Sequence, residues 1–437
     1  MSGPHASEHP HASGHGHGKH DAARDSRLRT VEEHLAVVLS AVRVLPTTRV
    51  PLSEAFGRTL AEPVVSRVDI PVFDNSAMDG FAVRSEDVAA AASHHPVRLR
   101  VVADLPAGTS LDPALRPGEA ARIMTGSPVP AEADAIVPFE DTAGGLDGTG
   151  EIVEVLAPAA AGAHVRRRGA DSVAGTEIVP AGVVLGGFQV AAAAAAGVPE
   201  VVVHHAPRVA VVSTGSELAE PGSALERGQI PESNSLLLDG LVRGAGADVV
   251  LRATVPDEVG ALRRVLAEAA DRGADVIITS GGVSAGAYEV VKDTFGPGGE
   301  LQFTKVAMQP GKPQGFGVLE GGMLVFGLPG NPVSVAVSFE TFVRPALLAL
   351  QGRAERQRDV LRLPAAVAWR TPPGRRQYLP AAIDRSDPAR WTVRPATAGG
   401  SGSHLAGGLA AAEAFAVVPA DVSAVAAGDL VDVMLIP

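Results

Sequence analysis

The 437-residue sequence contains no cysteine. This absence excludes disulfides, thiolate metal sites, iron–sulfur clusters and cysteine nucleophiles. Aromatic residues are scarce, at 4 %, so alanine, valine and leucine must build the hydrophobic cores. Excess positive charge is also absent. The formal net charge of −12 argues against nucleic-acid binding, which requires a basic face, but a local site can still bind a small anion.

Long hydrophobic runs are nearly absent too. The start of the chain is polar, and no secretory signal is visible there. One uncharged run, residues 178–199, is long enough to raise the question of a membrane span. It carries two prolines and four glycines, and we interpret it as a strand followed by an alanine-rich helix at 187–196 that ends at Gly197. We therefore expect a cytoplasmic protein with no membrane partner.

What is present indicates several folded domains. Apolar residues make up 46 % and charged residues 20 %, as in globular proteins, and a prior of about 150 residues per domain suggests roughly three domains. Residues 1–26 hold six of the thirteen histidines, and we interpret them as a disordered tail, with buffering of a divalent metal as the alternative. Changes in composition and hydrophobic periodicity divide the rest into four domains. They are a mixed α/β linker domain (27–67 and 166–206), a β-rich domain (68–165), an α/β domain (207–352) and a C-terminal β domain (353–437).

Periodicity predicts the individual elements. Apolar residues at helical spacing predict a helix from Val31 to Val42, and a second short helix is expected from Leu52 to Leu60. In the β-rich domain, short valine- and isoleucine-rich runs predict strands at 97–102, 121–124, 135–137 and 152–155.

Strands and helices alternate regularly between residues 207 and 350. We expect strands at 209–213, 248–255, 274–280, 301–307 and 323–328, and helices at 235–243, 258–272, 288–295 and 332–350. This alternation predicts a parallel sheet with helices on both faces, which binds ligands outside the carboxyl ends of its strands.

Three loops at those ends have the composition of an anion site. The first follows a buried strand and carries Thr279, Ser280, Gly281, Gly282 and Ser284. Glycines allow backbone N–H groups to converge on an anion, and the next helix start adds partial positive charge. An ordinary strand-to-helix turn is the alternative.

The second loop runs from Lys305 to Pro313, where prolines on both sides of Gly311-Lys312 leave that lysine at the tip of a rigid turn. The third contains Pro329, Asn331 and Pro332, a good start for a helix. Because all three follow strands of one predicted sheet, we expect them to meet at one edge and bind a phosphate-bearing ligand.

Four further segments are weaker signals when each is taken alone. They are Phe73–Val83 with two carboxylates, Arg122–Pro130 after a strand, the Arg166–Arg168 triplet, and Ser213–Leu218 after a buried strand. Each is more often a turn or a solvated charge than a site.

Together, six of these motifs resemble one known family. They are DNSAMDGFAV, RIMTGSPVP, STGSEL, TSGGVSAG, PGKP and LPGNPVS, in the order and spacing of the molybdopterin molybdenumtransferase family, which is also similar to the gephyrin E domain. The resemblance covers nearly all of the chain after residue 27.

The resemblance implies an elongated four-domain homodimer whose central parallel α/β sheet domain resembles the molybdopterin-binding fold. The implied cleft lies between this domain of one subunit and the β-rich domain of the other. The implied reaction takes adenylylated molybdopterin and molybdate, inserts molybdenum at the dithiolene and releases AMP, with Mg²⁺ as cofactor. Handover of the product to molybdenum-enzyme maturation proteins is a further implication.

The resemblance also assigns residues by motif. Asp257 and Glu289 are the implied ligands of the metal and, through it, of the pyrophosphate. The other implied catalytic residues of the cleft are Asp79, Thr125, Asp171 and Glu217. The implied molybdate pocket contains Ser284, Lys312 and Pro313, and Arg375 and Ser403 from the last domain complete it. Lys305 joins these cations in the substrate site.

Two positions depart from the family pattern. Gln309 stands where a lysine is frequent, so the anion pocket loses a positive charge that Lys305 or Arg375 could replace. Glu289 stands where aspartate is usual. Two other functions remain open: molybdopterin adenylylation, whose family resembles residues 207–350 alone, and a non-catalytic scaffold that binds the cofactor.

Overall fold

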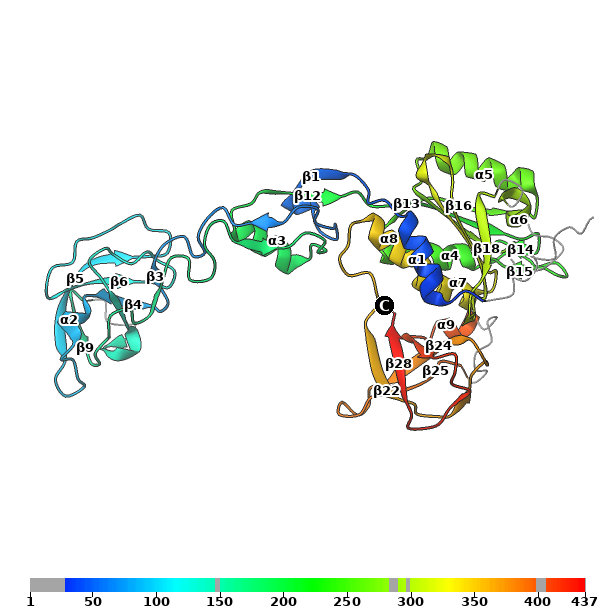
Figure 1. Ribbon diagram of the computed structural model, residues 1–437. Coiled ribbons are helices and arrows are strands. Elements are labelled where there is room, and N and C mark those ends of the chain that lie inside the picture. Colours follow the sequence, from blue (N-terminus) through cyan, green and yellow to red (C-terminus); the bar gives the residue numbers. More distant parts are fainter. Residues whose placement is uncertain (1–27, 146–149, 283–289, 296–298, 398–405, 437) are drawn as a thin grey trace, which may run out of the picture. The chain divides into compact units, whose positions relative to one another are not determined.

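The computed structural model describes residues 28–145, 150–282, 290–295, 299–397 and 406–436; the histidine-rich segment 1–26 lies outside them. The chain forms two compact units (Figure 1). The first comprises the chain up to Arg43, Pro207–Leu347 and Gln357–Pro437. The second comprises Val44–Ala206 and Leu348–Arg356.

Within the described residues, six strands form the α/β sheet of the first unit, in the order β16-β13-β17-β21-β20-β18. Their bounds are β13 (Arg208–Thr214), β16 (Asp248–Val255), β17 (Val276–Ser280), β18 (Leu301–Lys305), β20 (Pro313–Val318) and β21 (Leu324–Leu328). The first four strands in that order are parallel, whereas β20 runs antiparallel to both of its neighbours. The expectation of a wholly parallel sheet is therefore wrong at β20, which sequence patterning did not predict.

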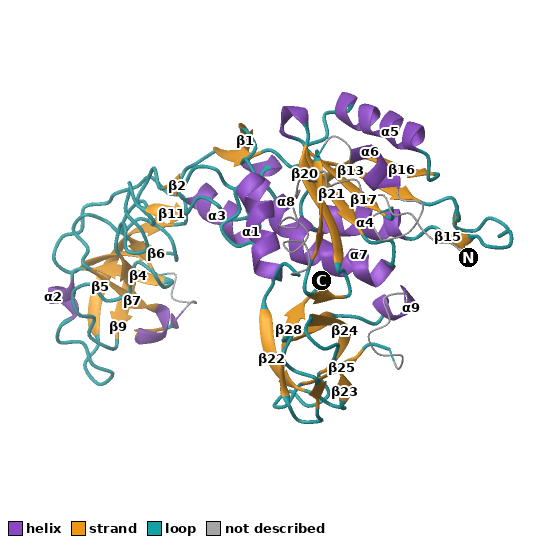
Figure 2. Ribbon diagram, turned by 45° about the vertical axis from the view of Figure 1, so that its right-hand side comes forward, coloured by secondary structure: helices purple, strands orange, loops and turns teal. Residues whose placement is uncertain are grey.

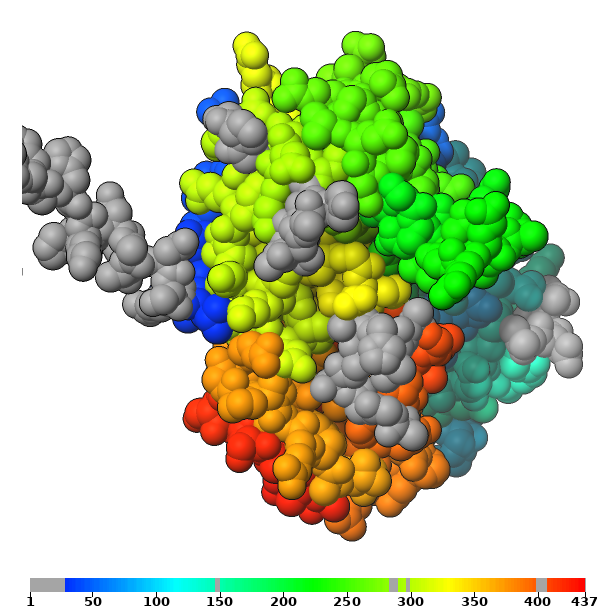
Figure 3. Space-filling model, turned by 90° about the vertical axis from the view of Figure 1, so that its right-hand side faces the viewer, coloured from blue at the N-terminus to red at the C-terminus, as the bar shows by residue number. Residues whose placement is uncertain are grey.

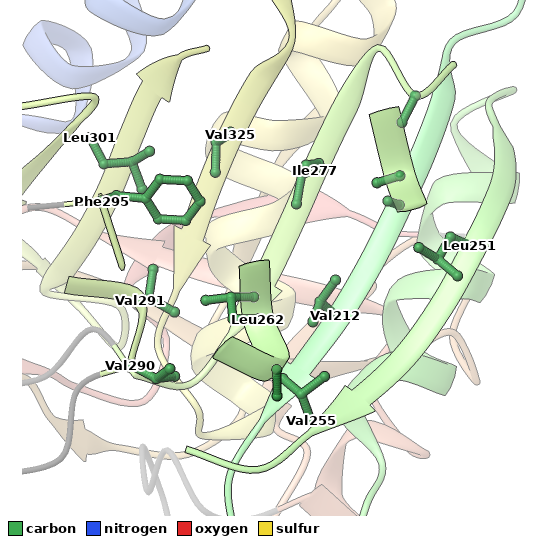
Figure 4. Packing of buried hydrophobic residues seen from close by; sticks show 14 residues of the cluster. Val212, Leu251, Val255, Leu262, Ile277, Val290, Val291, Phe295, Leu301 and Val325 are labelled. Carbon is green, nitrogen blue, oxygen red and sulfur yellow. The ribbon is translucent and has the colours of Figure 1, made fainter. Parts of the chain in front are cut away.

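Helices cover both faces of this sheet, with α5 and α6 on one face and α4 and α7 on the other (Figure 2). The bounds are α4 (Asn234–Gly244), α5 (Val259–Asp271), α6 (Val290–Phe295) and α7 (Pro332–Ser338), which continues through a π-helical turn (Phe339–Val343) into α8 (Arg344–Leu350). Figure 4 shows the core under α5 and α6, where Leu262 and Phe295 pack on Val212, Ile277 and Val325. Fully burying one such side chain contributes roughly 1.5–3 kcal/mol. A short β14 (Leu218–Ala219) pairs with β15 (Ile230–Pro231), and a 3₁₀ turn (Glu320–Gly322) precedes β21.

Pro332–Leu350 is the one helix of the described part of the chain that is long and apolar enough to span a membrane by composition. In the fold, 89 % of its 18-residue apolar window is buried inside the protein. Its hydrophobicity is therefore explained by core packing.

The C-terminal β domain also belongs to the first unit. Its elements are β22 (Val360–Pro364), β23 (Trp369–Arg370), β24 (Arg376–Asp384), β25 (Thr392–Pro395), α9 (Ala406–Leu409), β26 (Ala414–Val418), β27 (Ala424–Val425) and β28 (Leu430–Leu435). Strand order is β24-β26-β28-β22, with β25 paired to β24 and β23 paired to β27. At the other edge of β24, the short β19 (Met308–Gln309) of the α/β domain adds in parallel.

The β-rich domain lies in the second unit, and its sheet has the order β7-β4-β6-β5-β9-β8. Its elements are β4 (Gly80–Val83), α2 (Ser85–Val88), β5 (Val97–Leu105), β6 (Glu119–Ile123), β7 (Ala135–Pro138), a 3₁₀ turn (Phe139–Asp141), β8 (Thr142–Ala143) and β9 (Ile152–Val155). The four strands expected from sequence are confirmed. Separate cores cover its two faces, one around Phe81 and Leu99 and the other around Ile123 and Ile136.

The rest of the second unit is a small mixed domain. Its elements are β1 (Thr47–Pro51), β2 (Val64–Val65), β3 (Asn75–Ser76), β10 (Val165–Arg166), β11 (Glu177–Val179), α3 (Gly187–Ala195) and β12 (Glu200–His204). The strands pair antiparallel as β1-β12, β2-β11 and β3-β10. The expected alanine-rich helix is confirmed as α3, which ends before Gly197 at a φ of +73°.

Two expectations near the N-terminus need correction. The helix expected from Leu52 to Leu60 is wrong: only a 3₁₀ turn forms at Leu52–Glu54, Gly57 has a φ of +74°, and Leu60 makes an isolated bridge to Val203. The predicted first helix is confirmed as α1 (Val31–Ala41), which begins with a capping box between Thr30 and Glu33.

Helix α1 nevertheless does not pack with the linker domain to which the sequence analysis assigned it. It belongs to the first unit, because the ring of His34 packs edge-on against Phe342 at a centroid distance of 4.7 Å.

Candidate functional site

The carboxyl ends of five strands lie along one edge of the α/β sheet. Register pairs Ser213 with Ser280, Ser280 with Leu328, and Thr214 with Val255. Two reversals around β20 make β18 parallel to β21, so Lys305 also ends at this edge. The predicted convergence of the three loops is therefore confirmed, although the strand between the second and third loops had not been foreseen.

The first loop leaves β17 through two glycines. Gly281 has a φ of +97°, and its N–H donates to the carbonyl of Leu328 at 3.0 Å. A Cβ at this position would lie 2.5 Å from the carbonyl oxygen of Thr214, so only glycine fits. Gly282 also has a positive φ, +66°.

Both hydroxyl residues before the glycines are buried. Thr279 and Ser280 are 0 % and 1 % exposed, and their side chains are hydrogen-bonded within the protein. Among the described residues of this loop, the half-buried Gly281 and Gly282 are thus the most exposed. Ser284 and Glu289 lie outside the described residues.

The second loop presents its two lysines to solvent. Lys305 and Lys312 are exposed, Pro313 is half-buried, and the backbone closes through a Val306 N–H donating to the carbonyl of Lys312 at 2.7 Å. Buried Gln314 fixes the turn from below. Its Nε2 donates to the Gly311 carbonyl at 2.7 Å and contacts the Ser338 hydroxyl at 2.7 Å. Gln314 was missed by sequence reasoning, because an amide inside an unpredicted strand gives no distinctive signal.

Two other segments brace the same loop. The Arg29 N–H donates to the carbonyl of Lys305 at 2.9 Å, and the Ala307 N–H donates back to the Arg29 carbonyl at 2.8 Å. From the C-terminal domain, the Arg376 N–H donates to the Ala307 carbonyl at 2.9 Å. Figure 3 shows yellow-green atoms of the α/β domain in contact with orange atoms of the C-terminal domain. The half-buried Arg375 directly precedes Arg376, which pairs with Met308 of this loop; Ser403 lies outside the described residues.

The third loop begins α7. Pro329 is buried, Asn331 is exposed at the helix N-cap without a capping side-chain bond, and Pro332 is the first helical residue. The Asn234 side chain reaches this loop from α4 and donates to the Gly330 carbonyl at 2.7 Å.

Two carboxylates flank these loops at the ends of β13 and β16. Asp257 Oδ2 accepts from the Ser216 N–H at 3.2 Å, and the Ser216 hydroxyl accepts from the Asp257 N–H at 3.2 Å. The Glu217 carboxylate folds against Gly215, within 2.8 Å of where a Cβ would lie. These oxygen donors fit a hard divalent cation such as Mg²⁺. Among the residues that the structure describes, no group of three metal-ligating side chains forms a complete cage.

The remaining predicted residues lie in the second unit. Asp79 Oδ1 accepts from the N–H and the hydroxyl of Thr125 at 2.6 Å and 2.7 Å, and the backbone bond is the main cause of a lowered Asp79 pKa. Both residues are exposed. Asp171 is exposed in a turn whose backbone bonds to Ile70.

Two arginines of the Arg166–Arg168 triplet form ion pairs within the same unit. Arg167 pairs with Asp74 at 2.6 Å and Arg168 pairs with Asp69, so these two arginines hold together the segments around residues 70 and 170.

A buried carboxylate beneath the first loop was also missed. Glu232 is 5 % exposed and accepts hydrogen bonds from Ser213 and Ser235. In the sequence it stands before an expected helix, where an acidic residue is usually solvated.

Comparison with known proteins covers most of the chain. The family described as MoeA N-terminal region (domain I and II) matches residues 29–197, the Probable molybdopterin binding domain matches residues 210–349, and the MoeA C-terminal region (domain IV) matches residues 362–436. Molybdopterin molybdenumtransferase 2 of Mycobacterium tuberculosis is 46 % identical over 407 residues, which cover 92 % of this chain and 98 % of that one. The molybdopterin molybdenumtransferase of a Nostoc species is 40 % identical over 71 % of this chain and 70 % of its own length.

Solved structures agree with the sequence relatives. A molybdopterin biosynthesis moeA protein from Pyrococcus horikoshii superposes with a TM-score of 0.80 at 29 % identity, over 94 % of this chain and 100 % of that one. With matches to all three domain models and this likeness over nearly its whole length, the chain belongs to the molybdopterin molybdenumtransferase family.

Proposed function

We propose that this protein is a transferase of molybdenum cofactor biosynthesis that inserts molybdenum from molybdate into adenylylated molybdopterin and releases AMP. The observation that carries the proposal is the convergence of the glycine loop, Lys305, Lys312 and Arg375 at one edge of the α/β sheet. Cations beside glycines, which carry no side chains, suit the two anions of this reaction, molybdate and a phosphoanhydride. The absence of cysteine is compatible, because the pterin itself supplies both sulfur ligands.

The chain's own residues would act by binding and orientation. Lys312, held on a turn that Gln314 fixes, meets an anion without much further ordering of the loop. Gly281 and Gly282 allow a phosphate to approach the backbone closely. The two thiols of the dithiolene form two Mo–S bonds as one Mo–O bond of molybdate breaks, and that oxygen leaves as water with the two protons that the thiols release. A second water adds across the P–O–P bond of the adenylylated pterin, which yields AMP and the terminal phosphate of molybdopterin.

We further propose that Mg²⁺ is held at this edge by Asp257 and Glu289, with Glu217 nearby. When bound, the ion would neutralise charge that develops on the phosphoanhydride as it is cleaved. Asp257 is half-buried and held by Ser216, so its carboxylate is positioned before any ligand arrives.

We also propose a cytoplasmic homodimer in which Asp79, Thr125 and Asp171 of one chain complete the site of the other. Support comes from the rigid Asp79–Thr125 pair, an exposed carboxylate fixed by two hydrogen bonds. Handover of the finished cofactor to maturation proteins of molybdenum enzymes follows from the same proposal.

The test supplies purified protein with Mg²⁺, molybdate and adenylylated molybdopterin, and measures AMP release and the formation of active cofactor. We expect both products. AMP formed only when ATP and unmodified molybdopterin are supplied would favour adenylylation instead, and binding without turnover would favour the scaffold. The matches to residues 29–197 and 362–436, outside the α/β domain, support the transferase.

A further inference from the structure

Glu232 is a buried carboxylate beneath the site edge. Oε1 accepts from the Ser213 hydroxyl and the Ser235 N–H, both at 2.8 Å, and Oε2 accepts from the Ser235 hydroxyl at 2.6 Å. Within the described ranges, no lysine or arginine forms an ion pair with it. Its negative charge is therefore solvated by hydroxyls and a backbone amide, not cancelled by a cation.

These hydrogen bonds have a defined direction. A carboxylate can only accept, so the Ser213 proton is directed toward Glu232. The 3.1 Å contact between the Ser213 and Ser280 hydroxyls must then use the Ser280 proton. The chain from Ser280 through Ser213 to Glu232 places the carboxylate two hydrogen bonds from the residue that precedes Gly281.

The segment that carries Glu232 is fixed on its other side as well. Two residues later, Asn234 donates to the Gly330 carbonyl of the third loop at 2.7 Å. The Glu232 backbone N–H donates to the Ala219 carbonyl at 2.8 Å. The backbone that carries the carboxylate is therefore anchored to two neighbouring segments.

A fixed negative charge at this place opposes anion binding. Burying a carboxylate also costs desolvation, which a neutral side chain of the same size would avoid. The opposition disappears when the incoming anion is paired with a divalent cation, because the pair carries little net charge and the cation is attracted by the same carboxylate.

We propose that Glu232 couples the two ligands of this edge, so that a phosphate anion binds well only together with a divalent cation. The inference rests on the proposed function, and Glu232 acts as a positioning residue through Ser213 and Ser280. Its role would be to discourage unproductive binding of metal-free nucleotide at a site that otherwise presents two lysines and an arginine.

The experiment measures binding of AMP to the full-length protein by calorimetry, once with excess Mg²⁺ and once with EDTA. The Glu232→Gln variant keeps the size of the side chain and removes the charge. A unit charge at roughly 10 Å and an effective dielectric constant of about 20 changes an affinity by about tenfold. We expect Glu232→Gln to strengthen AMP binding in EDTA by about that factor, with little change in Mg²⁺. The Mg²⁺ dependence should shrink accordingly.

Two controls separate charge from geometry. Glu232→Asp keeps the charge and should keep the Mg²⁺ dependence, even if both affinities fall. Glu226→Gln makes the same charge change at an exposed position and should leave both affinities unchanged, because water and salt screen it. Circular dichroism and thermal unfolding report whether each variant folds.

If Glu232→Gln does not fold, the variant Glu232→Leu, Ser213→Ala, Ser235→Ala replaces the whole polar network and should show the same weakened Mg²⁺ dependence. A Mg²⁺ dependence equal to that of the wild type in a folded, charge-free variant would overturn the coupling role alone. Failure of the wild type to bind AMP even with Mg²⁺ would overturn the proposed function as well.

Discussion

The edge of the α/β sheet and the Asp79–Thr125 surface of the β-rich domain are built on opposite principles. The sheet edge exposes Lys305 and Lys312, and it buries Thr279, Ser280 and the acid Glu232. The β-rich surface exposes a carboxylate and fixes it with the backbone N–H and the hydroxyl of Thr125, both neutral donors. The first arrangement attracts anions. The second presents a carboxylate acceptor, and the two hydrogen bonds from Thr125 lower its pKa.

The stability of the two units of the chain should also respond differently to acid. In the first unit, burial is the main cause that lowers the pKa of His34 to about 4, and the charge of Arg29 adds to it. In the second unit, hydrogen bonds from Ala174 and Arg168 lower the pKa values of Asp69 and Asp74. As pH falls, the His34 contribution to stability is therefore lost first, and the contributions of the ion-paired aspartates are lost only at lower pH.

The largest expected effect is on the cation-bearing edge. Lys312→Ala should lower the rate of AMP release by about 100-fold, because a pre-positioned donor to the reacting anion is lost. Steady-state kinetics with adenylylated molybdopterin measure this change. Arg272→Ala, which removes an exposed cation at the end of α5, is the matched control and should retain activity. An active Lys312→Ala enzyme would contradict the assignment of the anion site to this edge.

A second prediction concerns His34. The folded protein keeps this ring neutral while the unfolded chain takes up a proton below its ordinary value of 6.5. The stability that the neutral His34 ring contributes is therefore fully present above pH 6.5 and is lost as pH falls toward about 4. The expected decrease in the free energy of unfolding is about 2 kcal/mol between about pH 7 and about pH 5.

Guanidinium unfolding of the first unit at those two pH values measures the loss. His34→Leu should flatten the difference, and an equally steep dependence in that variant would assign it to other groups. This prediction sharpens the contrast with the second unit, whose unfolding should stay nearly constant over the same range.

A third prediction tests the support of the lysine turn. Gln314→Leu leaves the Gly311 carbonyl without its buried donor, which costs about 1–3 kcal/mol of stability. The KM for adenylylated molybdopterin should rise by about tenfold, since a mobile Lys312 must be ordered on binding. Unchanged kinetics in a destabilised variant would show that the turn needs no support from below.

The smallest effect is expected at the β-rich surface. Thr125→Val removes the hydroxyl donor of Asp79 and leaves the backbone donor, which is the larger cause of the lowered pKa. The Asp79 pKa should therefore rise only part of the way to 3.8, as NMR titration of the carboxyl carbon would report. The stability that this carboxylate adds is present above 3.8 and lost as pH falls through its folded pKa. A rise to the full ordinary value would mean that the hydroxyl dominates.

Sequence patterning was informative where one period persists over many residues. Val259–Asp271 and Asp248–Val255 follow helical and strand patterns, and the structure confirms both. The loops after β17, β18 and β21 could be placed together because strand ends of one sheet share an edge. The six motifs then located the family and its site.

Patterning failed where tertiary contacts override local composition. β20 contains Gly315 and Gly317, which look like a loop, yet a Cβ at Gly317 would lie 1.9 Å from the Glu300 carbonyl. Glycine is thus required there by the close approach of β18. The predicted helix after Pro51 failed for a similar reason, because Ala55 and Leu60 are buried in the core of the small domain. Glu232 and Gln314 were missed because their burial depends on the fold: each bonds one neighbour three residues away, and Ser213 or Ser338 reaches it only in the folded chain.

The most direct test of the central claim is a crystal structure of the protein with AMP, molybdate and Mg²⁺. We predict the AMP phosphate against the backbone of Gly281 and Gly282, with Lys312 within hydrogen-bonding distance of one of the two anions. Ordered AMP elsewhere on the protein, with this edge empty, would contradict the assignment.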